Sequence, residues 1–219
     1  MKIKQVFDLD SLKGNLYFMS DLHIGHENVL KLDNRPFNEV NEMNQYILNE
    51  LKNKLTPEDI LIDLGDTFWR HSEKDCCNFI DEIPANTIIH IMGNHDKYPL
   101  YYHQYSKLRQ KFFMVADILD IVVKKDKKLY QLALSHYPLL EWNGQYNGAL
   151  MIHGHTHGHM DKFNESSIHL RVDIGFSSDL AKRVGTFILS FNDILNYFTE
   201  KTNGTEFFKW AKQYECGSL

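Results

Sequence analysis

An α/β or α+β fold is the class that this sequence predicts, and two of its features lead there. Short apolar runs of strand length alternate with segments in which apolar residues recur every three or four positions, as on one face of a helix. The 219 residues are 43% hydrophobic and 24% charged, which is ordinary for a globular chain that buries its own core. We expect a single domain over residues 1–219, with the weakly patterned residues 199–219 as a candidate C-terminal appendage.

The first half of the chain predicts three buried strands and two helices. Apolar runs of strand length occupy residues 15–20, 60–62 and 87–91. Residues 41–55 carry apolar side chains at helical spacing, and Thr56-Pro57 would end that helix. Ser72 is a preferred helix N-cap, with an acidic residue three positions later, so a second helix is expected from there to about residue 83.

The second half predicts a hairpin, three further strands and two helices. A tyrosine-rich helix is expected over residues 100–111. Two β-rich runs flank the lysine-rich segment 124–128, which therefore predicts a hairpin tip between strands at 118–123 and 129–134. Ser190 or Asn192 would cap a final helix. The later strands are expected at 149–152, 168–174 and 186–190, and the final helix at 192–198.

The net charge and the cysteine content limit which binding partners and which cellular compartment we expect. With 24 Lys and Arg against 29 Asp and Glu, the net charge is −5, so we expect no strong nucleic-acid surface. Three cysteines, of which Cys76 and Cys77 are adjacent and Cys216 stands alone, do not suit a disulfide framework. The N-terminal residues form no signal sequence, and no apolar run is long enough to cross a membrane. We therefore expect a cytoplasmic protein without a membrane partner; the oligomeric state stays open.

Polar residues follow the predicted strands closely. Asp21, Asp66, Asn94, His136 and His155 each stand directly after an apolar strand-like run or within a few residues of one. In open α/β sheets the carboxyl ends of the strands form one crevice in which ligands bind. These five segments can therefore converge on a single site.

The segments together supply seven nitrogen or oxygen donors of the kinds that bind metals. One tetrahedral zinc site uses four, so seven point to two ions that share a bridging ligand. Imidazole and carboxylate without thiolate suit borderline or hard divalent ions, and we expect manganese, with iron, zinc, nickel or magnesium as alternatives. The glycines before Asp66, Asn94 and His155 permit close approach of the backbone. The seven candidate ligands are Asp21, His23, Asp66, Asn94, His136, His155 and His157.

The order of these motifs resembles the signature of the calcineurin-like metallophosphoesterases. That signature runs Asp-x-His, Gly-Asp, Gly-Asn-His-Asp, His, Gly-His-x-His, and here it spans residues 21–157. The segment 21–28, followed by Asn-Arg-Pro-Phe at 34–37, looks like a group of small bacterial and phage phosphoesterases. The resemblance implies a four-layer α/β/β/α sandwich of two mixed sheets, with the metals at the sheet ends.

The resemblance also assigns roles to individual residues. Asp66 would bridge the two ions, and a hydroxide that bridges the ions would attack phosphorus in line. His95, which is not a ligand, would protonate the leaving oxygen as general acid. Asp96 would assist as an anchor that orients a histidine. The first ion would be held by Asp21, His23, Asp66 and His157, and the second by Asp66, Asn94, His136 and His155.

One departure from the family bears on the reaction. In the protein Ser/Thr phosphatase branch, Gly-Asp is followed by a second Asp that orients the acid histidine, and Trp69 occupies that position here. Trp69 also stands where the purple acid phosphatases need a tyrosine ligand. Both branches are thereby disfavoured, and the balance moves modestly towards phosphodiesters.

Several neighbouring residues are candidates for binding the substrate. His26 and Asn28 follow the first ligand pair and would contact the substrate or its leaving group, unless they belong to an ordinary polar loop. Arg35 would clamp phosphate or, equally, form an ion pair that locks the loop. Arg70 falls where the phosphatase branch has a phosphate-binding arginine. Aromatic residues over 98–113 would stack a nucleobase or pack in the core.

Three functions remain in view. The first is a dimetal phosphodiesterase that acts on a small phosphorylated or nucleotide-like substrate. The second is a phosphomonoesterase, including a protein phosphatase. The third is a non-catalytic scaffold that uses the same cleft, which the complete ligand set and His95 disfavour.

Overall fold

Two five-stranded mixed sheets form the centre of the computed structural model, which describes residues 5–96 and 112–204. The strands of the first sheet follow the order β1-β6-β7-β8-β9, and those of the second β10-β2-β3-β4-β5. The first sheet consists of β1 (Gln5–Asp8), β6 (Ile118–Lys125), β7 (Lys128–Ser135), β8 (Leu150–His153) and β9 (Arg171–Asp173). The second consists of β10 (Leu189–Ser190), β2 (Leu16–Met19), β3 (Ile60–Asp63), β4 (Thr87–Ile91) and β5 (Phe112–Ala116).

Strand direction explains where a site can form. In the second sheet β2, β3, β4 and β5 are parallel, and β10 is antiparallel to β2. In the first sheet β7, β8 and β9 are parallel, β6 and β7 form an antiparallel hairpin, and β1 runs parallel to β6. The loops that follow parallel strands leave at the same sheet edge, so each sheet presents its loops to a common crevice.

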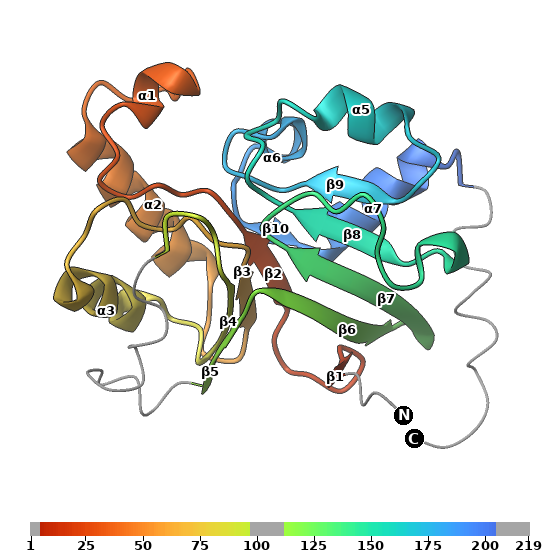
Figure 1. Ribbon diagram of the computed structural model, residues 1–219. Coiled ribbons are helices and arrows are strands. Elements are labelled where there is room, and N and C mark those ends of the chain that lie inside the picture. The colour runs from red at the N-terminus through yellow and green to blue at the C-terminus, as the bar shows by residue number, and fades with distance from the viewer. Residues whose placement is uncertain (1–4, 97–111, 205–219) are drawn as a thin grey trace.

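The core lies between the sheets and continues outside the second one. Apolar side chains that point inwards from both sheets form one cluster with α7 (Phe191–Lys201), in which Phe18 and Phe198 are fully buried. A second cluster joins the outer face of the β2–β5 sheet to α2 (Val40–Lys54) and α3 (Glu73–Glu82). These helices lie together on one side of the molecule (Figure 1).

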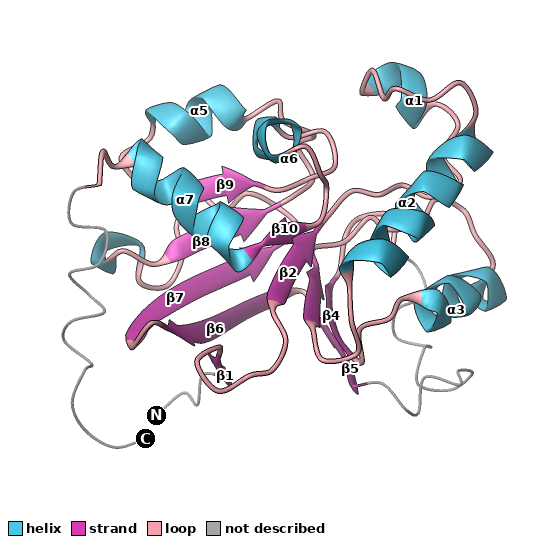
Figure 2. Cartoon of the chain, turned by 180° about the vertical axis from the view of Figure 1, so that it is seen from behind, coloured by secondary structure: helices cyan, strands magenta, loops and turns pink. Residues whose placement is uncertain are grey.

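The outer layer on the first sheet is thinner. Trp142 packs on Ala133 and Met151 there, next to the short 3-10 helix η3 (Gln145–Asn147). The helix α5 (Asp161–Ser166) contributes Asn164, whose Oδ1 accepts a hydrogen bond from Arg171 Nε–H of β9. Helices α5, α6 (Asp179–Val184) and α7 group around the β8–β9 end, as Figure 2 shows from behind. The two mixed sheets, with helices outside them, confirm the predicted fold class.

Most predicted elements occur, with bounds that packing explains. The strands before the candidate ligands and the hairpin are present, and the hairpin strands extend further than predicted. Ser72 caps α3 by accepting from Asp75 N–H, and Ser190, not Asn192, caps α7. The strand predicted over 168–174 shortens to β9, and Ile168, outside it, is 90% exposed. The predicted helix over 100–111 and most of the appendage lie outside the described residues.

Some elements carry no clear sequence signal. The edge strands β1 and β5 and the short helices α1 (Val29–Leu32), α5 and α6 were not predicted. Each of them has few residues, so hydrophobic periodicity has too short a window to show. Among the helices in the described ranges, none is long and apolar enough to cross a membrane.

Candidate metal centre

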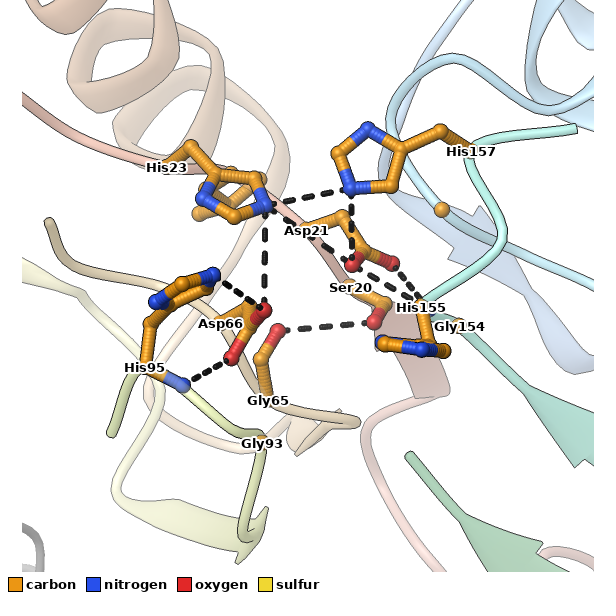
Figure 3. Close-up of polar contacts among 12 residues, drawn as sticks. Ser20, Asp21, His23, Gly65, Asp66, Gly93, His95, Gly154, His155 and His157 are labelled. Atoms are coloured by element: carbon orange, nitrogen blue, oxygen red, sulfur yellow. Dashed lines mark hydrogen bonds and ion pairs between the residues drawn. The ribbon is translucent and has the colours of Figure 1, made fainter. Parts of the chain in front are cut away.

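The candidate site lies where loops leave the carboxyl ends of strands in both sheets. Asp21 follows β2, Asp66 follows β3 and Asn94 follows β4, while His136 and His155 follow β7 and β8. Figure 3 shows the side chains of Asp21, His23, Asp66, His95, His155 and His157 turned towards one another from these loops. The convergence expected from the strand ends is therefore present.

The backbone at the site is strained in a consistent way. Asp21, His23, Asp66, His155 and His157 all have positive φ angles, between 50° and 68°. Side chains other than glycine rarely take this conformation, and each such residue costs of order 1–3 kcal/mol, which persists where the surrounding structure enforces it. Five strained residues that aim their side chains at one point indicate a functional site.

Two glycines let the backbone approach the carboxylates. A Cβ atom at Gly93 would lie 2.2 Å from Asp66 Oδ1, and one at Gly154 would lie 2.4 Å from Asp21 Oδ2. Atoms that are not bonded cannot come so close, so any other residue would displace the carboxylate. The glycines stand there because the carboxylates pack directly on the chain.

One group of possible metal donors comprises Asp21, His23 and His157, whose donor atoms all lie within 4.8 Å of one another. His157 Nε2 lies 3.5 Å from Asp21 Oδ1 and 3.2 Å from His23 Nε2. The Nδ1–H of His157 donates to Asp33 Oδ2 at 2.6 Å. With that hydrogen on Nδ1, the neutral ring presents the Nε2 lone pair to the group, as a metal ligand must.

The second group comprises Asp66, His136 and His155, again within 4.8 Å. His136 Nδ1–H donates to the Leu64 carbonyl at 2.7 Å, so its Nε2 faces Asp66 Oδ2 at 3.4 Å. Asn94 Oδ1 lies 3.2 Å from the same Nε2. Asp66 Oδ2 is also 3.8 Å from His23 Nε2, so this carboxylate stands between the two groups.

Burial and neighbouring charges shift the pKa values of the candidate ligands in opposite directions. Burial raises the pKa of Asp21 to about 7, although His136 and His157 oppose the shift. Burial lowers the pKa of His23 to about 3. Burial would lower the pKa of His136 too, but Asp66 and Asp21 outweigh it and raise that pKa to about 9. Carboxylates and neutral imidazoles packed at these distances suit divalent cations, so the residues present fit a dinuclear centre.

Arg35 belongs to the support of the site and not to its surface. Its side chain is 1% exposed. Nη2 donates to the Asp21 carbonyl and Nη1 to the Leu22 carbonyl, each at 2.7 Å, and Nε and Nη2 both donate to Asp33. A guanidinium enclosed in this way has no pair of N–H groups available to bind a phosphate. The geometry corrects the phosphate-clamp hypothesis and favours the ion pair that locks the loop.

Asp96 likewise supports the chain and does not face the donors. Asp96 Oδ2 accepts from the N–H groups of Asp66 and Gly93, both at 2.8 Å, and lies 3.0 Å from His90 Nε2. His90 Nδ1 lies 2.8 Å from Asp63 Oδ2 at the end of β3. Burial disfavours a charged His90, but Asp96 and Asp63 prevail and raise its pKa to about 10. The Asp96 side chain is 2% exposed and contacts a histidine, His90, as an anchor would.

His95 is a partly exposed histidine in the loop that follows β4. Its side chain is 35% exposed, and Nε2 lies 3.9 Å from Asp66 Oδ2. Its ring makes an edge-type contact with the Trp69 ring, with centroids 4.3 Å apart, and His26 stacks on Trp69 at 3.9 Å. Trp69, at the position where the phosphatase branch has an aspartate, thus packs directly against the candidate acid.

The remaining predicted residues divide by location. Asn28 and Arg70 are exposed and line a cavity next to Trp69, so they stay candidates for substrate binding. The aromatic residues over 98–111 lie outside the described part of the chain. Sequence reasoning missed Asp33, Asp63 and His90, which carry no motif of their own; a histidine inside the apolar run 87–91 was the one available signal.

Comparisons with known proteins match most of this chain. The family model described as calcineurin-like phosphoesterase matches residues 14–159. The uncharacterized protein MJ1445 of Methanocaldococcus jannaschii is 28% identical over 165 residues, covering 73% of this chain and 82% of that protein. The gene 66 protein of Mycobacterium phage L5 is 25% identical over 181 residues, 73% of this chain and 86% of its own.

A solved structure shares the fold. The crystal structure of AQ665 from Aquifex aeolicus, titled a protein of unknown function, superposes with a TM-score of 0.58. The match covers 84% of this chain and all of that one, at 24% sequence identity. At this identity the likeness supports the fold of two mixed sheets and carries no information about substrate.

We predict that His90 stays protonated well above neutral pH. Its pKa in the folded chain, about 10, exceeds the ordinary value of 6.5, so its stabilising effect is complete below pH 6.5 and disappears as pH rises through about 10. Imidazole nitrogen chemical shifts recorded from pH 6 to 9 should report the charged ring throughout. A titration of His90 near pH 6.5 would contradict the buried ion-pair network.

We predict that Asp33→Asn weakens metal binding in the group that contains His157. The change removes the negative charge that holds the Nδ1–H of His157, and loss of such partners costs roughly 10–100-fold in metal affinity. Competition with a chelator would measure both affinities. The matched control is Asp179→Asn, an exposed carboxylate on α6. Equal affinities in Asp33→Asn and the parent protein would remove Asp33 from this role.

Proposed function

This chain belongs to the calcineurin-like phosphoesterase family, and from that premise we propose that it is a phosphodiesterase acting on a small or nucleotide-like substrate. Membership makes it a metal-dependent phosphoesterase. The family typically uses a dinuclear metal centre, and this chain has two groups of donors that could each hold an ion. The observation that carries the proposal is the pair of donor groups with Asp66 between them. Manganese is the ion we propose, because the donors combine imidazole and carboxylate and include no thiolate.

The residues divide the work of hydrolysis among themselves. Bound ions would act as Lewis acids towards the phosphoryl oxygens and make a water nucleophilic near neutral pH. Asp66 would fix the spacing of the two ions, since it faces both donor groups. Asp21, His23, Asp66 and His157 would hold one ion, and Asp66, Asn94, His136 and His155 the other.

His95 is proposed as the general acid. Its ring lies beside Asp66 and is partly exposed to solvent, so it can donate a proton to the oxygen that leaves phosphorus. An alkoxide is a poor leaving group, and a positioned acid lowers the barrier by protonating it as the bond breaks. Both diesters and alkyl monoesters benefit from such an acid.

The preference for diesters is supported by the surroundings of His95. At the position where the phosphatase branch has a second aspartate, the ring of Trp69 packs against the acid. The adjoining cavity, lined by Trp69 and Arg70, leaves room for a second substituent on phosphorus. A monoester has one organic group to place, whereas a diester must place two.

We predict faster turnover of a diester than of a monoester. Protein stripped of metal and reloaded with manganese would be assayed on bis-p-nitrophenyl phosphate and on p-nitrophenyl phosphate at equal concentrations. The diester should be cleaved faster. Faster monoester turnover would instead support a phosphomonoesterase, and no turnover with two ions bound per chain would support a scaffold.

We predict that His95→Ala loses about 10²-fold or more in rate on diesters with poor leaving groups. The loss should be smaller for p-nitrophenolate, which leaves without a proton. Metal content should match the parent, because His95 lies in neither donor group. The control His159→Ala removes an exposed histidine from the loop after β8. Equal rates for parent and His95→Ala would exclude the acid role.

A further inference from the structure

A polar cavity of about 560 Å³ opens beside the candidate metal centre. Its walls come from three places: the loop 25–28, the first turns of α2 and the loop 69–75 that leads into α3. These elements belong to the helical layer over the second sheet (Figure 1). The volume falls within the range of pockets that take small organic ligands.

The cavity shares a wall with the proposed general acid. Trp69 lines the cavity, and its ring also meets His95 with centroids 4.3 Å apart. His26 stacks on Trp69 at 3.9 Å with the planes only 10° apart, so the indole is held in place. The acid must reach the leaving oxygen, so the group attached to that oxygen would lie on the His95 side of phosphorus. The cavity lies on that same side, next to Trp69.

Hydrogen bonds hold the walls in one shape. Asn44 Oδ1 accepts from Gly25 N–H at 3.0 Å and ties α2 to the first loop. His71 Nδ1–H donates to the Trp69 carbonyl at 2.9 Å. The His71 ring packs so closely on Gly25 that a Cβ there would lie 2.0 Å from its Cε1. The cavity wall is therefore already ordered before a ligand binds, which reduces the conformational entropy lost on binding.

The lining tells which chemistry the cavity recognises. Among its described lining residues Val40 is the one aliphatic side chain, and most of the other side chains are polar and able to form hydrogen bonds. Amides such as Asn28 and Asn41 donate and accept, which suits hydroxyl groups and base edges. Asn28 precedes α1 without using its side chain as a cap, so its amide is not committed to the helix. Two carboxylates, Glu27 and Asp75, also line the cavity and can accept hydrogen bonds from sugar hydroxyls. Arg70 is exposed at the cavity, 5.4 Å from the Trp69 ring centroid, and its guanidinium can donate two parallel hydrogen bonds to a phosphate.

We propose that this cavity is the subsite for the leaving group and that the leaving group is a sugar phosphate or nucleotide. Its hydroxyls would meet the amides, and its own phosphate would meet Arg70. The inference rests on the proposed phosphodiesterase function. Hydrolysis breaks the bond between phosphorus and the leaving oxygen, water contributes hydroxyl to phosphorus, and the proton from His95 ends on the leaving oxygen. The departing alcohol is then a neutral hydroxyl of a sugar phosphate within the cavity.

Isothermal titration calorimetry with ribose 5-phosphate tests the subsite without requiring turnover. The full-length protein would be titrated loaded with manganese and after chelation, with ribose and inorganic phosphate as comparison probes. Ribose 5-phosphate should bind at least tenfold more tightly than ribose in both states. Arg70→Ala should weaken ribose 5-phosphate about tenfold, and Asn28→Ala by about threefold. Lys182→Ala, which removes an exposed cation on α6, is the matched control and should bind as the parent does.

The outcomes separate this inference from the function on which it rests. If chelation abolishes binding and Arg70→Ala leaves it unchanged, the phosphate sits on the metals and the subsite is refuted. Inorganic phosphate that binds as tightly as ribose 5-phosphate after chelation would also refute it. Binding to the parent that Arg70→Ala weakens, in a protein that cleaves no diester, would keep the subsite and refute the phosphodiesterase.

Discussion

The buried carboxylate of Asp21 is the constraint around which the rest of the site is arranged. Asp21 has no exposed surface, and burial raises its pKa to about 7. A carboxylate in that position needs donors or a cation close by. Asp21 has two such neighbours: His155 N–H donates to its carboxylate at about 3.0 Å, and His157 Nε2 lies 3.5 Å from it. Gly154 and the positive φ of Asp21 follow from the same closeness.

A buried ionic network stands behind each donor group. Behind the first group, Arg35 binds the Asp21 carbonyl, and Asp33 joins Arg35 to His157. Behind the second, Asp96 holds the N–H groups of Asp66 and Gly93, and His90 joins Asp96 to Asp63. Buried ion pairs add little net stability, because desolvation offsets their attraction. Their effect here is positional, since each fixes the backbone or ring of a candidate ligand.

The sequence predicted the parts of the fold and the site that leave a local signal. Apolar runs ended by polar residues located β2, β3, β4, β7 and β8, and those polar residues converge as expected. Arg35 shows the limit, because sequence alone could not tell a guanidinium that faces phosphate from one enclosed by carbonyls. The partnership of Asp63, His90 and Asp96 depends on the pairing of β3 with β4, which places Asp63 opposite His90. That register is a tertiary property that no single motif encodes.

Trp69 connects the chemistry of the site to the choice of substrate. An aspartate beside the acid histidine would orient it through a hydrogen bond and add a negative charge near the phosphate. An indole orients the same ring by packing, in an edge-type contact with His95 and with His26 stacked on the indole. Packing contributes no charge, so nothing from Trp69 repels an anionic leaving group. The same indole forms a wall of the polar cavity, where Arg70 adds a positive charge beside the carboxylates of Glu27 and Asp75. Replacing a carboxylate by a tryptophan thus changes both how the acid is held and which leaving groups the neighbouring space accommodates.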